Sequence, residues 1–208
     1  MDWERLNRDK SADIIGKITH ASDDTLFSGS SSEAVCTALP FYKSFLLYRV
    51  TNYATLPSFS LDFLGDGNTF YLLDGSPDPI FMVNSRGNLR LKYENIPDYV
   101  EFFLKYVTTE DGDIYIIKDP DNLPFLDSMS IEQQISLKQR FSPPTLDYND
   151  QDDCFELRGD IYYGGTLLKA KITVSMDGAI SFSDHAMLSH ETSAYQNYDH
   201  TPDQDAGV

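Results

Sequence analysis

Five carboxylates and one asparagine lie within the twelve-residue stretch LDYNDQDDCFEL, residues 146–157. Oxygen ligands at this density are the kind that Ca²⁺ binds. A calcium-binding loop beginning at Asp147 would need glycine at its sixth position and glutamate at its twelfth, where this chain has Asp152 and Arg158. The spacing therefore excludes an EF-hand. It favours a turn between two strands, because Asn and Asp side chains hydrogen-bond to the backbone of turns, and we predict no metal site.

The sequence contains no familiar catalytic or cofactor signature. The motifs GxSxG, HExxH, GxxxxGK and GxGxxG are all missing. The consecutive residues 183–185, Ser-Asp-His, do not form a triad, because neighbours along a strand point to opposite faces of a sheet. Cys36 and Cys154 lack the CxxC spacing of zinc and redox sites. We predict that the protein needs no cofactor, and we favour a non-enzymatic function.

Two sets of polar residues remain as candidate sites. The first set could line a pocket and act as general acid, as general base or as contacts for a polar ligand: Asp62, Asp66, Asp74 and Ser76. The second set could form a contact surface, because it combines the one basic cluster of an acidic chain with an outward-facing tyrosine: Arg86, Arg90, Lys92 and Tyr162. Turn chemistry and charge balance explain the same residues without a ligand, so both sets are hypotheses.

The charge of the chain limits the classes of partner. Sixteen basic and 33 acidic residues give a formal net charge of −17. Nucleic-acid binding depends on Lys and Arg, so this charge argues against nucleic acid and, for the same reason, against anionic membranes. A basic partner protein fits, and a homodimer is the other partner that we consider. The start of the chain has no apolar leader, and no run of about 18 apolar residues occurs, so we expect a cytoplasmic protein.

Composition divides the chain into three parts. Residues 1–39 form an N-terminal, partly flexible segment with a short helix over 11–20 and a linker-like run over 28–33, and we expect little core contribution from it. Residues 40–189 form a single domain. Residues 190–208 contain no Lys or Arg and almost no aliphatic residue, so we expect a flexible acidic tail, in which Tyr195 and Tyr198 could join a contact surface.

The elements of the central domain follow from apolar periodicity and turn residues. Strands over 45–53, 59–64, 69–73 and 80–83 are expected, the last three forming a first meander over 58–84, and a further strand covers 114–117. Helices are expected over 95–107, with Asn95 as cap, and over 130–139, where Ser130 and Gln133 have the spacing of a capping box.

The helix over 95–107 is apolar around most of its circumference. Such a helix must be covered on more than one side. We expect it to be buried between a sheet and another element, with contact to a second copy of the chain as the alternative.

The C-terminal meander, 145–185, allows its register to be predicted. A two-residue loop at 164–165 pairs Ile161 with Leu168 and Leu157 with Ile172, which keeps one face apolar. A three-residue loop over 176–178, with Gly178 in the left-handed conformation, continues that face into the last strand. The same register sets Asp160 opposite Lys169 on the other face, which we expect to be solvated.

Together these elements predict an α+β fold in which antiparallel sheet from two meanders packs against one or two helices. The order of a helix followed by a long-stranded meander resembles cystatin-like or NTF2-like curved sheets. We expect a non-enzymatic protein-binding or self-associating domain. The alternative is a small-molecule-binding protein, or a carboxylate-dependent enzyme, with its pocket between sheet and helix.

Overall fold

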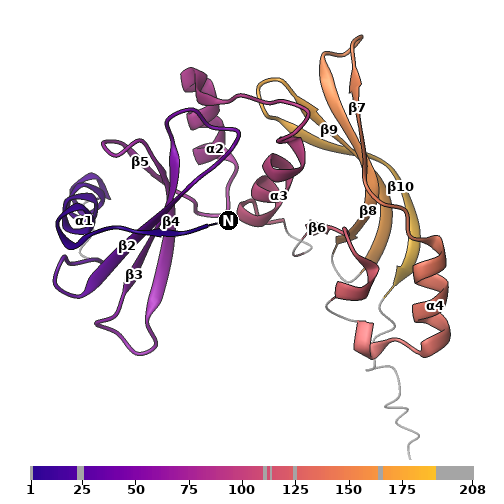
Figure 1. Cartoon of the computed structure of the whole chain (residues 1–208), viewed down its shortest axis with the longest axis horizontal. Coiled ribbons are helices and arrows are strands. Elements are labelled where there is room, and N and C mark those ends of the chain that lie inside the picture. The colour runs from indigo at the N-terminus through magenta and orange to yellow at the C-terminus, as the bar shows by residue number, and fades with distance from the viewer. Residues whose placement is uncertain are drawn as a thin grey trace, which may run out of the picture.

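Two antiparallel sheets, with helices between and around them, make up the fold (Figure 1). The structure is a computed structural model, and it describes residues 2–22, 26–109, 112, 114–123, 126–163 and 166–190. The two sheets and their helices confirm the predicted α+β class with antiparallel sheet. The predicted tail over 190–208, with Tyr195 and Tyr198, lies outside the described residues except for His190, which ends the last strand.

The first sheet has the strand order β1-β2-β3-β4-β5. Its strands are β1 (Glu4–Arg5), β2 (Ser32–Ala38), β3 (Leu46–Asn52), β4 (Phe59–Gly65) and β5 (Phe70–Leu72). Helix α1 (Arg8–Ser22) packs against β2, and helix α2 (Asp78–Val83) with the π-helical turn Asn84–Asn88 follows β5.

The second sheet has the order β10-β9-β8-β6, and β7 also pairs with β8. Its strands are β6 (Ile114–Ile116), β7 (Thr145–Asn149), β8 (Cys154–Tyr163), β9 (Thr166–Ser175) and β10 (Ile180–His190). Helix α3 (Ile96–Tyr106) precedes it, and 3-10 turns (Pro120–Asn122, Leu126–Ser128) and helix α4 (Ile131–Arg140) connect β6 to β7. Strands β6 and β7 lie beside different parts of β8, on the side away from β9.

The N-terminal segment contributes a core of its own, so the expectation of little core contribution was wrong. Ile14, Ile15 and Ile18 form one face of α1 and pack in a buried cluster with residues of β2, β3 and β4. The serine-rich run that resembles a linker leads directly into β2, which pairs with β3 over its whole length. Hydrogen-bonded pairing with β3 gives this segment its strand structure, although its serine-rich composition is typical of a flexible linker. The proposed boundaries 1–39, 40–189 and 190–208 stay predictions.

The stretch predicted as a strand over 80–83 is part of helix α2 instead. Ile80 and Val83 are fully buried, whereas Phe81 and Met82 between them are exposed. A spacing of three between buried residues is that of a helix. A four-residue apolar run fits a strand or a helix turn equally well, and Pro79 in the first turn favours the helix.

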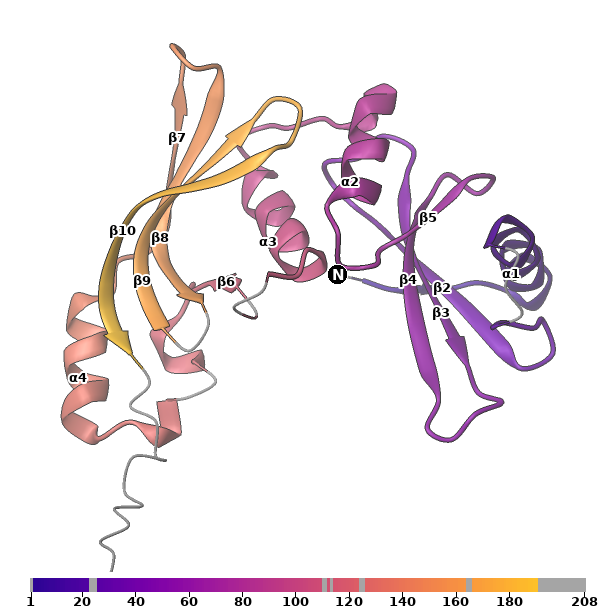
Figure 2. The ribbon, with the colours of Figure 1, turned by 180° about the vertical axis from the view of Figure 1, so that it is seen from behind.

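Helix α3 lies between the two sheets (Figures 1 and 2). Ile96, Tyr99, Val100 and Phe102 are 0% exposed. They belong to one large cluster that includes residues of β3 and β4 as well as β8 and β9. The prediction that this helix is buried inside the fold is confirmed.

The two helix caps differ in outcome. Ser130 and Gln133 form the predicted capping box at the start of α4. Asn95 occupies the predicted N-cap position of α3, and its carbonyl accepts from the Tyr99 amide, but its side chain makes no capping hydrogen bond to the helix. Its carboxamide accepts from the Lys92 amide and donates to the carbonyls of Pro40 and Arg90, and it thereby holds the loop before the helix.

The register of the C-terminal meander is as predicted. Ile161 pairs with Leu168 and Leu157 with Ile172. In the next hairpin Val174 pairs with Ile180, and Gly178 has a φ of +88°. The carboxylate-rich stretch is the turn between β7 and β8, where the side-chain oxygen of Asn149 accepts from two backbone amides within the turn.

The outer face of the second sheet is covered in part, so the expectation of a solvated face was wrong for Asp160, whereas Arg158 and Lys169 are 49% and 43% exposed. Leu137 of α4 packs with Ile117, Leu123 and Leu167 in a third buried cluster. The Asp160 side chain is 3% exposed and pairs with Lys169 at 3.0 Å. The sequence pattern of β8 alone did not reveal which other segment would pack on its polar face.

A buried polar network joins α3 to the end of the second sheet. The Tyr99 hydroxyl donates to the Gly178 carbonyl at 2.7 Å and accepts from the Asn84 amide at 3.0 Å. Asn84 also donates to the Asp177 carbonyl and accepts from the Tyr42 hydroxyl. These bonds satisfy polar groups that would otherwise be costly to bury.

Gly178 should tolerate substitution much less well than another glycine of similar backbone conformation. An added Cβ at Gly178 would lie 2.3 Å from the Tyr99 hydroxyl, whereas at Gly67, with a φ of +90°, it would meet nothing within 4 Å. Gly67→Ala should therefore cost only the left-handed strain of about 1–2 kcal/mol. Gly178→Ala should add an overpacking cost of about 1–3 kcal/mol. Urea unfolding of both variants measures the difference, and equal losses would contradict the tight contact.

Alkaline pH should destabilise the fold through its buried tyrosines. Burial raises the pKa of Tyr99 to about 12 from 10.0. The neutral phenol is thus favoured in the fold, and its contribution to stability is complete below pH 10 and is lost as pH rises towards 12. In urea unfolding across this range, Tyr99→Phe should start from lower stability but show a shallower decline than the wild type. Tyr53→Phe, at an exposed tyrosine, is the control and should keep the full decline.

Candidate functional site

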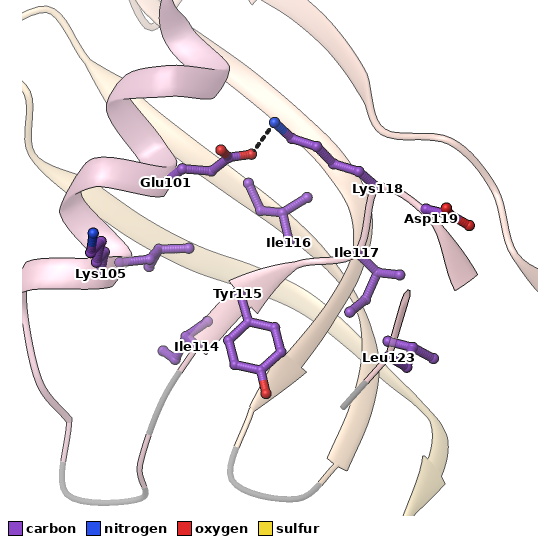
Figure 3. A pocket seen from close by; sticks show the side chains of 10 residues that line it. Glu101, Lys105, Ile114, Tyr115, Ile116, Ile117, Lys118, Asp119 and Leu123 are labelled. Atoms are coloured by element: carbon purple, nitrogen blue, oxygen red, sulfur yellow. Dashed lines mark ion pairs between the residues drawn. The ribbon is translucent and has the colours of Figure 1, made fainter. Parts of the chain in front are cut away.

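A pocket lies between α3 and the edge strand β6 (Figure 3). Its volume is about 600 Å³. One wall is α3, with Glu101, Leu104 and Lys105, and the other is the consecutive run 114–119 followed by Leu123. A strand that lines a pocket with every one of its residues presents its edge to that pocket, since its side chains alternate between two faces.

Strand β6 has an unpaired edge on the side away from β8. The Ile117 amide donates to the Asp160 carbonyl at 2.8 Å, which fixes the direction of the ladder. Because backbone groups alternate in an antiparallel pair, the N–H and C=O groups of Ile114 and Ile116 point away from β8. Within the described part of the chain, these outward groups have no hydrogen-bond partner. The β6 groove, which we define as this edge together with the pocket beside it, therefore offers main-chain donors and acceptors.

The charges at the β6 groove lie on its rim. Lys118 forms an ion pair with Glu101 across the groove (Figure 3). Lys105 lies with its ammonium group 5.2 Å from the centre of the Tyr106 ring. Between these groups the wall is apolar, with Leu104, Ile114 and Ile116. The groove can thus hold an apolar group at its centre and polar groups at its ends.

Asp62, a predicted pocket residue, is bound within the fold. Its carboxylate accepts two hydrogen bonds from the Arg49 guanidinium, both 2.7 Å, and a third from the Tyr106 hydroxyl at 2.8 Å. The hydrogen bonds to Asp62 raise the pKa of Arg49. Trp3 lies over the same guanidinium at 4.9 Å. The arrangement links the first sheet to the end of α3 and leaves Asp62 no open position for a substrate.

The other predicted pocket residues stabilise turns. Asp66 accepts from the Asn68 and Thr69 amides between β4 and β5, and these bonds lower its pKa. The Ser76 hydroxyl and amide both donate to Asp74, which lowers the pKa of that carboxyl. None of the described pockets is lined by these residues or by Asp62. The hypothesis that these four residues share a pocket stays a prediction without geometric support.

The predicted contact residues are also separated. Arg86 lies over the Tyr71 ring at 5.2 Å, beside the first sheet. Arg90 and Lys92 lie in the loop before α3, with the Arg90 guanidinium donating to the Leu89 carbonyl. Tyr162 stacks on Tyr115 at 4.8 Å on the covered face of the second sheet. Arg86 and Tyr162 thus lie beside different sheets, and the hypothesis that all four residues share one contact surface stays a prediction.

Sequence reasoning predicted both walls of the β6 groove and offered a pocket between sheet and helix as an alternative, but it did not predict the residues that line the groove. The helix over 95–107 and the strand over 114–117 were expected, and each is present. What the sequence did not reveal was that β6 lies at a sheet edge beside α3. That position depends on the pairing of β6 with β8, more than forty residues later in the chain. The short apolar strand followed directly by Lys118 was the available signal, because charged residues often flank edge strands.

Comparisons of the chain with protein-family models, with curated proteins and with solved structures found no significant match. Of the helices that the structure describes, none is both long and apolar enough to cross a membrane. Among the same residues, no group of three His, Cys, Asp or Glu side chains is placed to hold a metal ion. The geometry of the site is therefore the basis on which a function is proposed.

The pair formed by Arg49 and Asp62 should behave as a structural ion pair. The Asp62 side chain is 12% exposed and that of Arg49 is 36% exposed. Arg49→Met leaves a poorly hydrated carboxylate without its cation and should cost about 1–3 kcal/mol, less than for a fully buried pair. The double variant Arg49→Met/Asp62→Leu should recover part of that loss, because it removes the unpaired charge. Chemical unfolding tests this, and a double variant less stable than Arg49→Met would contradict it.

Proposed function

We propose that the chain is a non-enzymatic protein-binding domain that binds an extended segment of a partner protein in the β6 groove. The observation that carries the proposal is the unpaired main-chain edge of β6 facing an apolar pocket. An extended peptide can add a strand to such an edge, with main-chain hydrogen bonds giving affinity and pockets for alternate side chains giving specificity. A pocket made only for a small apolar molecule would not need a row of main-chain donors and acceptors.

The other sheet edges are less suited to strand addition. Strand β10 is long, but its pairing with β9 shifts register twice, between Ser183 and Ala186 and between Met187 and Ser189. Such irregularities protect edges from further pairing. The Leu146 carbonyl of β7 accepts from the Tyr93 hydroxyl. In the first sheet the edge strand β1 has only two residues, and no described pocket lies along β5, which has three residues like β6.

Charge supports a partner segment with basic residues around its apolar centre. The chain as a whole has a net charge of −17, which speeds association with positive partners, while the lining of the groove itself is balanced, with Lys105 and Lys118 against Glu101 and Asp119. The net charge also disfavours the alternative of self-association through β6, because two copies would repel each other. Cys36 and Cys154 are both free and buried, which supports the cytoplasmic location that forms part of this proposal.

A small apolar ligand is the second candidate for the same groove. Its volume of about 600 Å³ is in the range of small-molecule sites. A carboxylate-dependent enzyme is the weaker form of this alternative, since Glu101 is paired with Lys118, and Asp119 accepts from the Asp121 amide. The absence of two converging free carboxylates in the described lining favours a binding function over catalysis.

Selection from a peptide library tests the proposal without a known partner. A random peptide library displayed on phage is selected on the immobilised chain, and enriched peptides are synthesised and titrated by fluorescence anisotropy. We expect alternating apolar residues flanked by Lys or Arg. Ile114→Lys places a charge at the groove and should abolish binding. Ile131→Lys, on the 76% exposed isoleucine of α4, is the matched control and should bind like the wild type.

Three results would contradict the proposal. The first is that selection enriches no peptide family, and the second is that Ile114→Lys keeps full affinity. The third is a wild-type dimer in sedimentation that Ile114→Lys dissociates, because the groove would then be occupied by a second copy. An affinity that does not change with ionic strength would contradict the prediction that the partner segment is basic.

A further inference from the structure

We propose a second binding site, for a small phosphate ester, in the pocket between β1, the start of α1 and the turn that leads into β2. This pocket has a volume of about 400 Å³ and is separate from the β6 groove. Its lining includes Arg5, Arg8, Glu33, Ser30 and Tyr53. Neither the sequence motifs nor the function proposed above uses these residues. The phosphate-ester site would be a second binding site on the chain, and it does not depend on peptide binding in the β6 groove.

The pocket has an excess of positive charge in a strongly acidic chain. Arg5 pairs with Glu33 at 2.5 Å. Arg8 has no ion pair or hydrogen bond from its side chain within the described part of the chain. Two guanidinium groups and one carboxylate leave one positive charge in excess, against a net charge of −17 for the whole chain. Guanidinium groups match the geometry of phosphate oxygens and can bind them in pairs of hydrogen bonds.

The position of Arg8 argues against a purely structural role. It is the first residue of α1, where the positive end of the helix dipole disfavours a cation. An arginine there costs the helix a little stability and gains no ion pair in return from the residues that the structure describes. A bound anion would reverse the sign of that interaction, because it would neutralise Arg8 and lie at the favourable end of the helix.

The remaining lining favours an ester over a free phosphate ion. Tyr53 is 58% exposed, and its amide donates to the Ser31 carbonyl, which fixes its backbone beside the pocket. An exposed tyrosine ring offers a flat surface for the organic part of a ligand. The Ser30 hydroxyl lies on the same rim and can donate to a phosphate oxygen.

A third pocket with more cations is less suitable. It has a volume of about 240 Å³ and is lined by Arg158, Lys169 and Lys171. Each of these cations is already paired with a carboxylate of β8, Glu156 or Asp160. Each of these three cations has a carboxylate within ion-pair distance, whereas Arg8 has none within the described part of the chain.

Calorimetric titration of the full chain with inorganic phosphate and with adenosine monophosphate tests the site. Both should bind, and the nucleotide should bind more tightly through Tyr53. Arg8→Gln should weaken both ligands roughly tenfold or more, the usual effect of losing a charge-assisted hydrogen bond. Arg140→Gln makes the same charge change at the far end of α4 and should leave both affinities unchanged. Tyr53→Ala should weaken the nucleotide and not inorganic phosphate.

Different results of these titrations would contradict the existence of the site, the role of Arg8 or the choice of a phosphate ester. Failure of both probes to bind at millimolar concentration would overturn it, as would equal effects of Arg8→Gln and Arg140→Gln. A nucleotide that binds no more tightly than inorganic phosphate would overturn the choice of an ester. Thermal unfolding shows whether Arg8→Gln is folded, and we expect its midpoint to equal or exceed that of the wild type. Ile114→Lys should bind both probes normally, so this test does not depend on the β6 groove.

Discussion

The structure depends on complete burial of helix α3. A helix that is apolar around most of its circumference cannot be stable at a surface, and one sheet covers only one side of it. Here both sheets contribute to the same buried cluster around Tyr99, Val100 and Phe102. The arrangement of the two sheets follows from this need. It also sets a condition for polar groups on the buried side of the helix: the Tyr99 hydroxyl must find partners, which are Asn84 and the Gly178 carbonyl.

Features that depend on neighbouring residues could be predicted from the sequence. The hairpin of β8 and β9 has one register that keeps its inner face apolar, and Gly178 marks the loop that continues that face. The capping box at Ser130 depends on a spacing of three residues, and the burial of α3 on its own composition. In each case the residues that determine the feature lie within one short segment of the sequence.

Features decided by distant contacts could not be predicted. Asp160 looks like a surface residue on its strand, and it is buried because α4 and the segment before it cover that face. Residues 80–83 are equally compatible with a strand and a helix, and their environment selected the helix. Asp62 could have lined a pocket, but Arg49 and Tyr106 occupy its oxygens. The β6 groove belongs to the same class, because it exists only where α3 and an edge strand come together.

The position of the groove beside α3 makes binding compatible with a stable fold. An unpaired strand edge is a risk for aggregation, and proteins limit it by keeping such strands short and flanking them with charge. Strand β6 has three residues, and Lys118, two residues after its end, forms an ion pair with Glu101 of α3 across the groove. The helix that supplies Glu101 is fixed between two sheets, so the far wall of the groove is rigid before any partner arrives. A preformed wall reduces the ordering that a bound segment must induce. The burial of α3 thus organises the core and at the same time fixes the wall beside the β6 edge, where we propose that a further strand adds.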